Sequence, residues 1–324
     1  MPRSLVTGGA GFLGSHLCER LLVAGHAVIC IDNMITGKIS NVHHLTERPG
    51  FTFVEADARH PLKVQGHIDH VFHLASLASP KDYAKLPVET LEAGSTGTAN
   101  ALEIAKASGS TFLFTSSSEV YGDPLVHPQS ESYWGNVNPN GPRSMYDESK
   151  RYGEALSMAY HRMHGISVRI ARIFNTYGPR MRIGDGRVIP SFMAQAIAGR
   201  PLTVYGNGSQ TRSLCYVEDT IEGLFLLGTQ TFSKGMPSTN LVMNIGNPQE
   251  LTMLELARKV IAITNSKSTI TYEALPEDDP RKRCPDISRA KAHLGWAPLV
   301  SLEAGLQAVM PYFKSAIVAE ARRP

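Results

Sequence analysis

A tyrosine and a lysine four residues apart, Tyr146 and Lys150, are the residues of this chain whose types and spacing best suggest chemistry. In a helix, residues at this spacing project from one face, so the two side chains would lie side by side. An unperturbed phenol has a pKa near ~10, and a neighbouring ammonium favours its ionised form. We therefore expect Lys150 to lower the pKa of Tyr146, so that the phenolate can take a proton from a hydroxyl group. The same spacing also occurs by chance in solvated amphipathic helices, so other motifs must support this interpretation.

The helix that carries this pair has an expected start a few residues earlier. Pro142 stands just outside it, Ser144 is a candidate N-cap, and Asp147 occupies the position of a capping-box partner. Asp147 and Glu148 also place negative charge near the positive end of the helix dipole, which stabilises a helix.

The start of the chain has the pattern of a dinucleotide site. An apolar strand at residues 3–7 is followed by GGAGFLG and by an apolar-periodic helix at residues 15–24. Gly8, Gly11 and Gly14 allow a tight turn, close approach of the backbone to a pyrophosphate, and close packing of helix on strand. A second strand, residues 27–31, leads to Asp32, where an acid accepts the ribose hydroxyls of NAD and repels the extra phosphate of NADP. The alternative is an ordinary turn acid.

Further strands are expected at residues 52–55, 70–74, 111–115 and 167–173, with a helix over residues 87–109. Strands that alternate with helices form parallel sheets, and ligands bind beyond the carboxyl ends of such strands. Asp57 follows the third strand, where it can meet an adenine amino group, and ASLASP after the fourth lets a cofactor pass close to the backbone. The expected cofactor contacts are Gly8, Gly11, Phe12, Leu13, Gly14, Asp32, Asn33, Asp57, Ala58, Leu74, Ala75, Tyr146 and Lys150.

The predicted fold class is therefore α/β, with a Rossmann-type doubly wound parallel sheet and a smaller α/β substrate-binding lobe. We assign residues 1–175 to the NAD-binding domain, with residues 217–246 returning to it. Residues 176–216 and 247–324 form the substrate-binding lobe. The cleft between the two is the expected substrate site.

The overall composition excludes several classes of partner. The 324 residues carry a formal charge of +3, which is too small to indicate a nucleic-acid partner. No signal peptide is apparent and no stretch of about 18 apolar residues could cross a bilayer, so we expect no membrane partner. The four cysteines are widely spaced and the histidines are scattered, which predicts no metal site and fits a reducing cytoplasm.

Several motifs together resemble the extended short-chain dehydrogenase/reductase family that acts on nucleotide sugars, over essentially the whole chain: TGGAGFLG, Asp32, SSSEVYGDP, YDESK and RIFNTYGPR. Within that family, the segments HPQSESYWGNVNP, GPRMRIGDGRV, GNGSQTRSLCYVED and PEDDPRKRCPDI are most similar to the UDP-glucuronate decarboxylases. The resemblance implies a UDP-sugar substrate, tightly bound NAD that is recycled, and a homodimer. It also implies oxidation of UDP-glucuronate at C4, loss of carbon dioxide from the resulting β-keto acid, and reduction to UDP-xylose.

The same resemblance assigns roles to individual residues. Ser117 would share the hydroxyl hydrogen bond with Tyr146, Lys150 would hold the nicotinamide ribose, and Glu119 would face C5 and C6 of the sugar or orient a water. Arginine does not readily give up a proton, so we expect Arg283 to position the carboxylate and stabilise the enolate. The expected catalytic residues are Ser117, Ser118, Glu119, Tyr146, Lys150 and Arg283. The expected substrate contacts, among which Asn175 and Arg212 match residues that bind the nucleotide, are Asn175, Arg182, Val188, Tyr205, Arg212 and Arg283.

Three other functions stay open at this point. The related dTDP-glucose 4,6-dehydratases carry an aspartate in place of Ser118, whose hydroxyl cannot supply an acidic proton. GDP-mannose dehydratases resemble this chain in pairing a hydroxyl residue with glutamate, but they keep NADP, against which Asp32 argues. A UDP-glucuronate 4-epimerase would use the same carboxylate recognition while protecting the keto acid, and a catalytically idle NAD-binding protein would usually have lost Tyr146 or Lys150. Two positions depart from the family pattern: Gly94, where many members have asparagine, and Ser149, where the decarboxylases usually have glycine.

Overall fold

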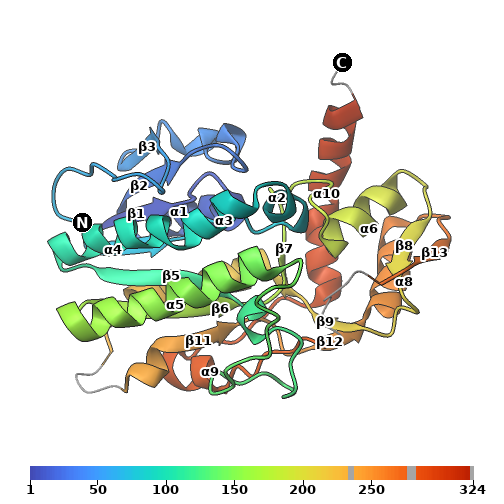
Figure 1. Cartoon of the computed structure of the whole chain (residues 1–324). Helices are drawn as coiled ribbons and strands as arrows, with labels where there is room; N and C mark the ends of the chain where they lie inside the picture. Colours follow the sequence, from blue (N-terminus) through green and yellow to red (C-terminus); the bar gives the residue numbers. More distant parts are fainter. Residues whose placement is uncertain (233–236, 276–281, 322–324) are drawn as a thin grey trace.

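Seven parallel strands form the sheet on which the rest of the chain is built (Figure 1). The computed structural model describes residues 1–232, 237–275 and 282–321. The strand order is β11-β6-β5-β4-β1-β2-β3, so β1 and β4 are neighbours at the point where the order reverses. The strands are β1 (Arg3–Thr7), β2 (Ala27–Asp32), β3 (Phe51–Glu55), β4 (His70–His73), β5 (Thr111–Ser117), β6 (Ser167–Ile173) and β11 (Val242–Ile245). This is the Rossmann-type doubly wound sheet that the sequence predicted.

Helices cover both faces of the sheet. This is required because successive apolar side chains of a strand point to opposite faces. In β1, Leu5 and Val6 are both fully buried but belong to different clusters, one on each face of the sheet. Burying such a side chain contributes about 1.5–3 kcal/mol. The helices α4 (Thr96–Ser108) and α5 (Ser144–His164) lie side by side on one face, and α1 (Phe12–Val23) and α7 (Val217–Thr229) lie on the other.

The helix expected over residues 87–109 is in fact two helices, α3 (Pro87–Gly94) and α4. Ser95 separates them with backbone angles of φ −101° and ψ −83°, outside the helical region. Ahead of them, the short helix α2 (Pro80–Lys85) begins with Pro80, and Ser79 caps it by accepting a hydrogen bond from the Asp82 amide.

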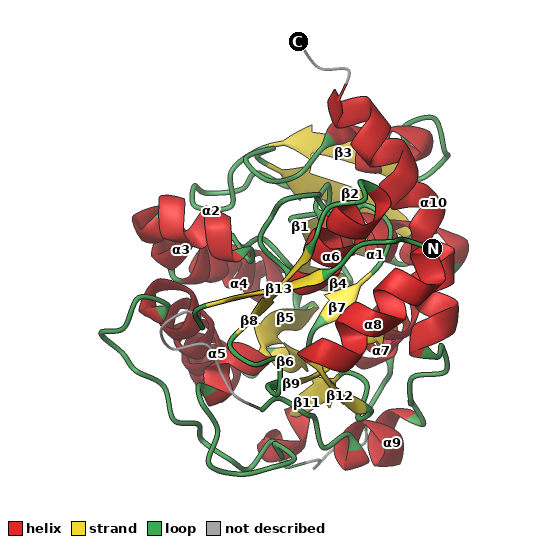
Figure 2. Cartoon of the chain, turned by 90° about the vertical axis from the view of Figure 1, so that its right-hand side faces the viewer, coloured by secondary structure: helices red, strands yellow, loops and turns green. Residues whose placement is uncertain are grey.

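The second lobe contains three helices, α6 (Val188–Ile197), α8 (Met253–Thr264) and α10 (Leu302–Ala321), and short strand pairs (Figure 2). Strand β8 (Leu202–Tyr205) pairs with β13 (Ile270–Glu273), β9 (Thr211–Ser213) with β12 (Glu250–Thr252), and β7 (Thr176–Tyr177) with β10 (Cys215–Tyr216). One hydrophobic cluster joins this lobe to the α1 and α7 side of the sheet. The helix α9 (Ser288–Leu294) packs against β11 and α7. The division into two lobes at the predicted boundaries stays a prediction.

Four short 3-10 turns complete the described structure: η1 (Ile39–Asn41), η2 (His43–Leu45), η3 (Ser118–Tyr121) and η4 (Ser238–Leu241). The turn η3 follows β5 directly and carries Ser118 and Glu119. In the part of the chain that the structure describes, no helix combines the length and apolar character needed to span a bilayer.

Candidate active site

A cavity of about 750 Å³ opens at the carboxyl ends of the parallel strands. All residues that the sequence predicted for cofactor binding, substrate binding and catalysis line this cavity, including Arg283 from the far end of the chain. Their individual roles stay predictions. A cavity of this size at the reversal of strand order is where doubly wound proteins bind their ligands.

In the glycine-rich turn between β1 and α1, the backbone packs so closely that no side chain could replace the hydrogen of Gly8 or Gly14. Gly8 has φ +70°, and a Cβ on it would lie 2.7 Å from the Ala75 nitrogen. A Cβ on Gly14 would lie 2.1 Å from the Gly8 carbonyl oxygen, so α1 packs directly on the turn. The first residues of α1, Phe12 to Gly14, line the cavity, and the first N–H groups of a helix have no partner within it, which suits a pyrophosphate.

Two acids follow at the ends of β2 and β3. Asp32 is buried and accepts hydrogen bonds from the Ala10 amide (3.0 Å) and the Met34 amide (2.9 Å). Burial raises its pKa, and these hydrogen bonds oppose the rise. Asp57 accepts from Asn33 (3.0 Å) and from Arg59; partial burial raises its pKa, but the contacts with Arg59 outweigh this and hold it at about 2. The site thus presents carboxylates where NAD has hydroxyl and amino groups, and the residues present fit that cofactor.

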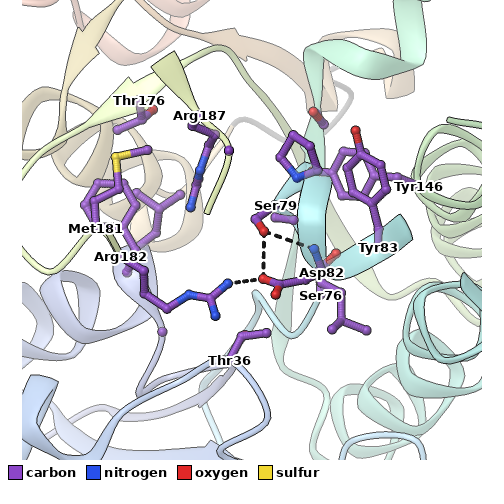
Figure 3. Close-up of a pocket in the computed structure, with 18 of the residues that line it drawn as sticks. Thr36, Ser76, Ser79, Asp82, Tyr83, Tyr146, Thr176, Met181, Arg182 and Arg187 are labelled. Carbon is purple, nitrogen blue, oxygen red and sulfur yellow. Dashed lines mark hydrogen bonds and ion pairs between the residues drawn. The ribbon is translucent and has the colours of Figure 1, made fainter. Parts of the chain in front are cut away.

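Tyr146 is buried at the inner end of the cavity and stacks on Tyr83 of α2, with ring centroids 5.3 Å apart and planes at 15° (Figure 3). Burial raises its pKa to about 12, while a hydrogen bond with Ser117 acts in the opposite direction. The expectation that Lys150 lowers this pKa is therefore wrong for the protein side chains alone, because the loss of hydration outweighs other effects.

Lys150 lies one helical turn beyond Tyr146 and is also buried. Its ammonium donates a hydrogen bond of 2.9 Å to the Thr115 carbonyl oxygen and lies 5.8 Å from the centroid of the Tyr146 ring. Burial lowers its pKa to about 7, because the ammonium loses hydration that favours its charge. The pair thus consists of a phenol that resists ionisation and an amine that readily exchanges its proton near neutral pH.

The start of α5 differs from the expected capping box. The N-cap is Arg143, without a side-chain cap, and Ser144 is the first helical residue. Asp147 is buried beneath the helix start, where burial and the nearby charge of Glu119 raise its pKa to about 7. The backbone of this turn is held instead by the Ser149 hydroxyl, which donates to the Tyr146 carbonyl oxygen at 2.7 Å.

Glu119 is held between two arginines. Arg143 donates to one carboxylate oxygen at 2.9 Å, and Arg283 pairs with the other. Burial raises the pKa of Glu119, but the two guanidinium charges dominate and lower it to about 2, so the group is an anion at neutral pH. Arg283 is 2% exposed and also contacts the Ser118 hydroxyl (3.3 Å) and the Gly122 carbonyl oxygen (3.1 Å).

On the other side of the cavity, Arg182 reaches across to α2. Its guanidinium pairs with Asp82, whose carboxylate also accepts a hydrogen bond of 2.7 Å from the Ser79 hydroxyl (Figure 3). Arg182 therefore links the segment between β7 and α6 to α2, whose Tyr83 stacks on Tyr146. Arg212 of β9 extends to the same cavity, and one of its nitrogens donates to the Thr211 carbonyl oxygen.

Several cavity residues escaped the sequence interpretation, notably Arg143, Tyr83 and Asp82. Arg143 had a signal that could have been used: an arginine at the positive end of a helix is unfavourable unless a carboxylate pairs with it. Tyr83 and Asp82 had none, because stacking and ion pairing between distant segments leave no spacing pattern. Part of the predicted motif PEDDPRKRCPDI, residues 276–281, lies outside the described residues.

Comparison with known proteins gives a consistent set of relatives. The family described as GDP-mannose 4,6 dehydratase matches residues 5–309. UDP-glucuronic acid decarboxylase 6 of Arabidopsis thaliana is 52% identical over 307 residues, which are 94% of this chain and 86% of that protein. UDP-glucuronic acid decarboxylase 1 of the same plant is 50% identical over 319 residues, 98% of this chain and 71% of that protein. Among solved structures, the UDP-glucuronic acid 4-epimerase of Bacillus cereus in complex with UDP-glucuronic acid and NAD has a TM-score of 0.83 at 30% identity, covering 97% of this chain and 99% of that one.

Proposed function

The chain belongs to the GDP-mannose 4,6 dehydratase family, as the predicted resemblance to the extended short-chain dehydrogenases implied, and on that premise we propose that it converts UDP-glucuronate to UDP-xylose. The observation that carries the proposal is the group formed by Arg283, Glu119 and Ser118 beside the buried Tyr146, in a chain about half identical to decarboxylases over nearly its whole length. Oxidation and decarboxylation then occur in one cavity.

The residues that would hold NAD are Gly8, Gly11 and Gly14 at the pyrophosphate, Asp32 at the adenosine ribose and Lys150 at the nicotinamide ribose. When bound there, NAD supplies an acceptor and later a donor of hydride for C4 of the sugar, together with a positive ring charge. We propose that it is tightly held and reused, as the resemblance implies. NAD that co-purifies with the protein and persists through gel filtration would support this, and protein that needs free NAD for each turnover would contradict it.

Tyr146 takes the proton of the C4 hydroxyl as that carbon becomes a ketone, and Ser117 stabilises the oxygen through its own hydrogen bond. The pKa of about 12 means that the phenol must lose part of this value when the charged cofactor and the substrate are present. The Ser117 hydroxyl already acts in that direction. At the end of the cycle Tyr146 returns its proton to the C4 oxygen.

The 4-keto acid then loses carbon dioxide: the bond from C5 to C6 breaks, and its electron pair moves onto the C4 oxygen as an enolate. Arg283 is buried and held in place by its ion pair with Glu119. Its guanidinium can therefore stabilise this oxyanion and orient the departing carboxylate without giving up a proton. Glu119 is ionised and therefore cannot itself donate the proton that C5 receives. We assign to it the orientation of a water that gives a proton to C5, and the hydroxide so formed takes up a proton from bulk solvent, which balances the loss of the carboxylate as carbon dioxide.

The decisive experiment is to incubate the purified protein with UDP-glucuronate and NAD and to identify the products by NMR. We expect UDP-xylose and carbon dioxide. UDP-galacturonate would instead indicate the 4-epimerase activity of the Bacillus cereus relative, and unchanged UDP-glucuronate would contradict both functions. Use of another nucleotide sugar would then have to be tested.

A homodimer formed through α5 belongs to the same proposal. Large apolar side chains stand exposed on α5 and the adjacent α3, among them Tyr152 (52%), Met163 (77%) and Leu91 (42%). Light scattering after gel filtration should give twice the monomer mass, and Tyr152→Glu should shift the protein toward monomer. Val23→Glu, at an exposed position on α1 across the sheet, is the matched control and should leave the mass unchanged. A cytoplasmic location, expected from the cysteine spacing, is testable by cell fractionation.

A further inference from the structure

The position of Arg283 depends on how the chain immediately after it is attached. Residues 284–286 run parallel to Gln129 and form an isolated bridge, Gln129 with Pro285. The Gln129 amide donates to the Cys284 carbonyl oxygen at 2.9 Å, and the Asp286 amide donates to the Gln129 carbonyl oxygen at 2.9 Å. These main-chain hydrogen bonds fix the direction of the segment next to Arg283, but they hold only a few residues of it.

Two fully buried amide side chains reinforce this attachment. The Gln129 side chain accepts from the Cys284 amide at 2.8 Å, one residue from Arg283, and donates to the Val126 carbonyl oxygen at 2.8 Å. Asn244 of β11 donates to two carbonyl oxygens, those of Gln129 and Asp286, each at 2.9 Å. Both side chains are 0% exposed. We call Gln129, Asn244 and the main chain of residues 284–286 the clasp.

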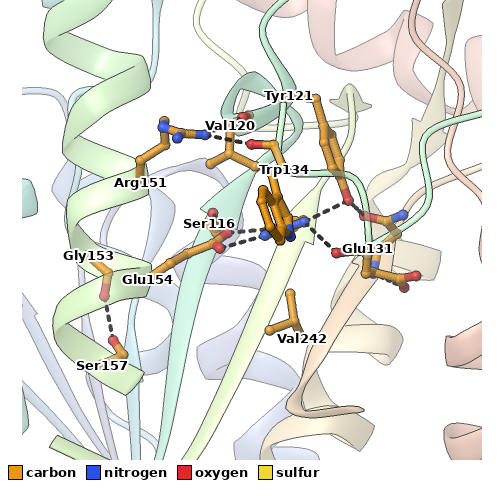
Figure 4. A network of polar contacts seen from close by, with 12 residues as sticks. Ser116, Val120, Tyr121, Glu131, Trp134, Arg151, Gly153, Glu154, Ser157 and Val242 are labelled. Atoms are coloured by element: carbon orange, nitrogen blue, oxygen red, sulfur yellow. Dashed lines mark hydrogen bonds and ion pairs between the residues drawn. The ribbon is translucent and has the colours of Figure 1, made fainter. Parts of the chain in front are cut away.

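The clasp is tied to the helix that carries the reactive pair. The Tyr121 hydroxyl donates to Asn244 at 2.8 Å and accepts from Arg172 at 3.0 Å. Arg172 forms a bidentate ion pair with Glu154 of α5, which also accepts from the Ser116 hydroxyl at 2.6 Å. Figure 4 shows Glu154 reaching from α5 toward Ser116 on β5, with Tyr121 on the far side of the network. Every link joins a different segment.

Neither Gln129 nor Asn244 lines the cavity. Their polar atoms are nevertheless used almost completely, although burying amides costs free energy unless each group finds a partner. An apolar pair would fill the same space. The amides also orient the main chain, because each hydrogen bond fixes a carbonyl or amide group in or beside the segment that is attached to Arg283.

We propose that Gln129 and Asn244 are positioning residues that set the placement of Arg283, and that they control the fate of the ketone without affecting its formation. The inference rests on the proposed decarboxylation. Tyr146 and Lys150 have anchors of their own, the Tyr83 ring of α2 and the Thr115 carbonyl oxygen of β5. The clasp reaches α5 indirectly, through several intervening side chains, whereas it bonds the residue next to Arg283 directly, so we expect oxidation at C4 to depend on it much less. A guanidinium displaced by about 1 Å from the developing enolate loses on the order of a hundredfold in rate. The two half-reactions should therefore respond differently to the same substitution.

The test uses the full-length protein loaded with NAD and mixed rapidly with UDP-glucuronate, with NADH absorbance followed in time and products identified by NMR. In Gln129→Met, which leaves the Cys284 amide without its side-chain acceptor, NADH should form within about threefold of the wild-type rate. Its reoxidation and the formation of UDP-xylose should slow by about tenfold to a hundredfold. Asn244→Ala, which removes the other amide, should give the same split.

Two further variants separate positioning from general destabilisation. Gln129→Glu, fully buried and therefore protonated, keeps an oxygen for the Cys284 amide and supplies an O–H for the Val126 carbonyl oxygen, so it should restore reoxidation toward the wild-type rate. Ser110→Ala removes a buried hydrogen bond of 2.6 Å to the Ile68 carbonyl oxygen, at the amino ends of β5 and β4 and so at the end of the sheet away from the cavity, and should leave the ratio of the two rates unchanged.

A wild-type protein that forms no UDP-xylose refutes the proposed function and this inference with it. If the wild type makes UDP-xylose but NADH formation and reoxidation fall by the same factor in Gln129→Met and Asn244→Ala, or neither rate changes, the positioning role alone is refuted.

Discussion

Replacing Gly94 by alanine tests how closely α3 packs on the helix that carries Tyr146 and Lys150. A Cβ on Gly94 would lie 2.6 Å from the Cβ of Ser149, 2.7 Å from its carbonyl oxygen and 3.0 Å from its carbonyl carbon. Two of these contacts are with backbone, which cannot rotate away, so α3 and α5 must move apart. Overpacking of this kind typically costs about 1–3 kcal/mol.

The companion substitution is Ser149→Gly, which removes the facing Cβ. Alone it should cost about 1–2 kcal/mol, because it loses the hydrogen bond to the Tyr146 carbonyl oxygen and adds a flexible glycine to α5. In the double variant the contact at 2.6 Å disappears while the contact with the carbonyl oxygen remains. We therefore expect partial rescue, with a coupling free energy of about 1 kcal/mol. The two departures from the family pattern, at positions 94 and 149, would then be one compensating pair.

The assay is urea unfolding of the four proteins, followed by turnover of UDP-glucuronate. Because a shift of α5 moves Lys150 relative to the Thr115 carbonyl oxygen, Gly94→Ala should also lower turnover by about tenfold, with partial recovery in the double variant. Gly97→Ala is the matched control, since its nearest neighbours lie at an ordinary 3.7 Å. Additive free energies, or a Gly94→Ala variant as stable and active as the wild type, would refute the packing argument.

Three further outcomes are expected. Tyr146→Phe should reduce turnover by at least about a hundredfold while NAD titrates normally, because phenylalanine keeps the stacking on Tyr83 but has no hydroxyl; undiminished turnover would exclude the proposed base. Burial lowers the pKa of Lys150 to about 7 from 10.5, so between these values the unfolded chain holds the extra proton and the free energy of unfolding rises with pH. Lys150→Met should flatten this rise in urea unfolding between roughly pH 7 and pH 9, and an unchanged pH slope would contradict the lowered pKa. Asp82→Asn and Arg182→Gln should couple by about 0.5–1 kcal/mol in a double-mutant cycle of unfolding free energies, less at high salt; simple additivity would argue against the ion pair.

The nucleotide end of the cavity was predictable because its signals are local. Gly8, Gly14 and Asp32 belong to one strand, turn, helix and strand, and the geometry of that unit fixes their relative positions once the elements are recognised. The strand and helix alternation likewise predicted the parallel sheet. The short helix α2 and the break at Ser95 were missed there; a single residue with non-helical angles leaves the periodicity almost intact.

The substrate end was less predictable because its contacts join distant segments. The pairing of Glu119 with Arg143 and Arg283 joins side chains from three separate segments, and contacts of this kind leave no spacing pattern in the sequence. Residue type alone also gave the wrong direction for the pKa of Tyr146, because burial determines that pKa. Next to a lysine, a tyrosine is expected to ionise more easily, yet desolvation raises the pKa of Tyr146 and lowers that of Lys150. Sequence spacing carries no measure of hydration.

The position of the edge strand β11 late in the chain affects the order in which parts of the site can form during synthesis. This strand pairs with β6 through Val242 and Ile170, which are far apart in sequence, and it supplies Asn244 to the clasp. Strands β1 to β6 leave the ribosome first, and domains generally fold from the N-terminal side during synthesis. A nascent chain can therefore assemble the glycine-rich turn and the Tyr146 pair while Arg283 has not yet been synthesised. Translation arrested in that interval would yield a chain with the oxidising half of the site but without the residues that complete the product.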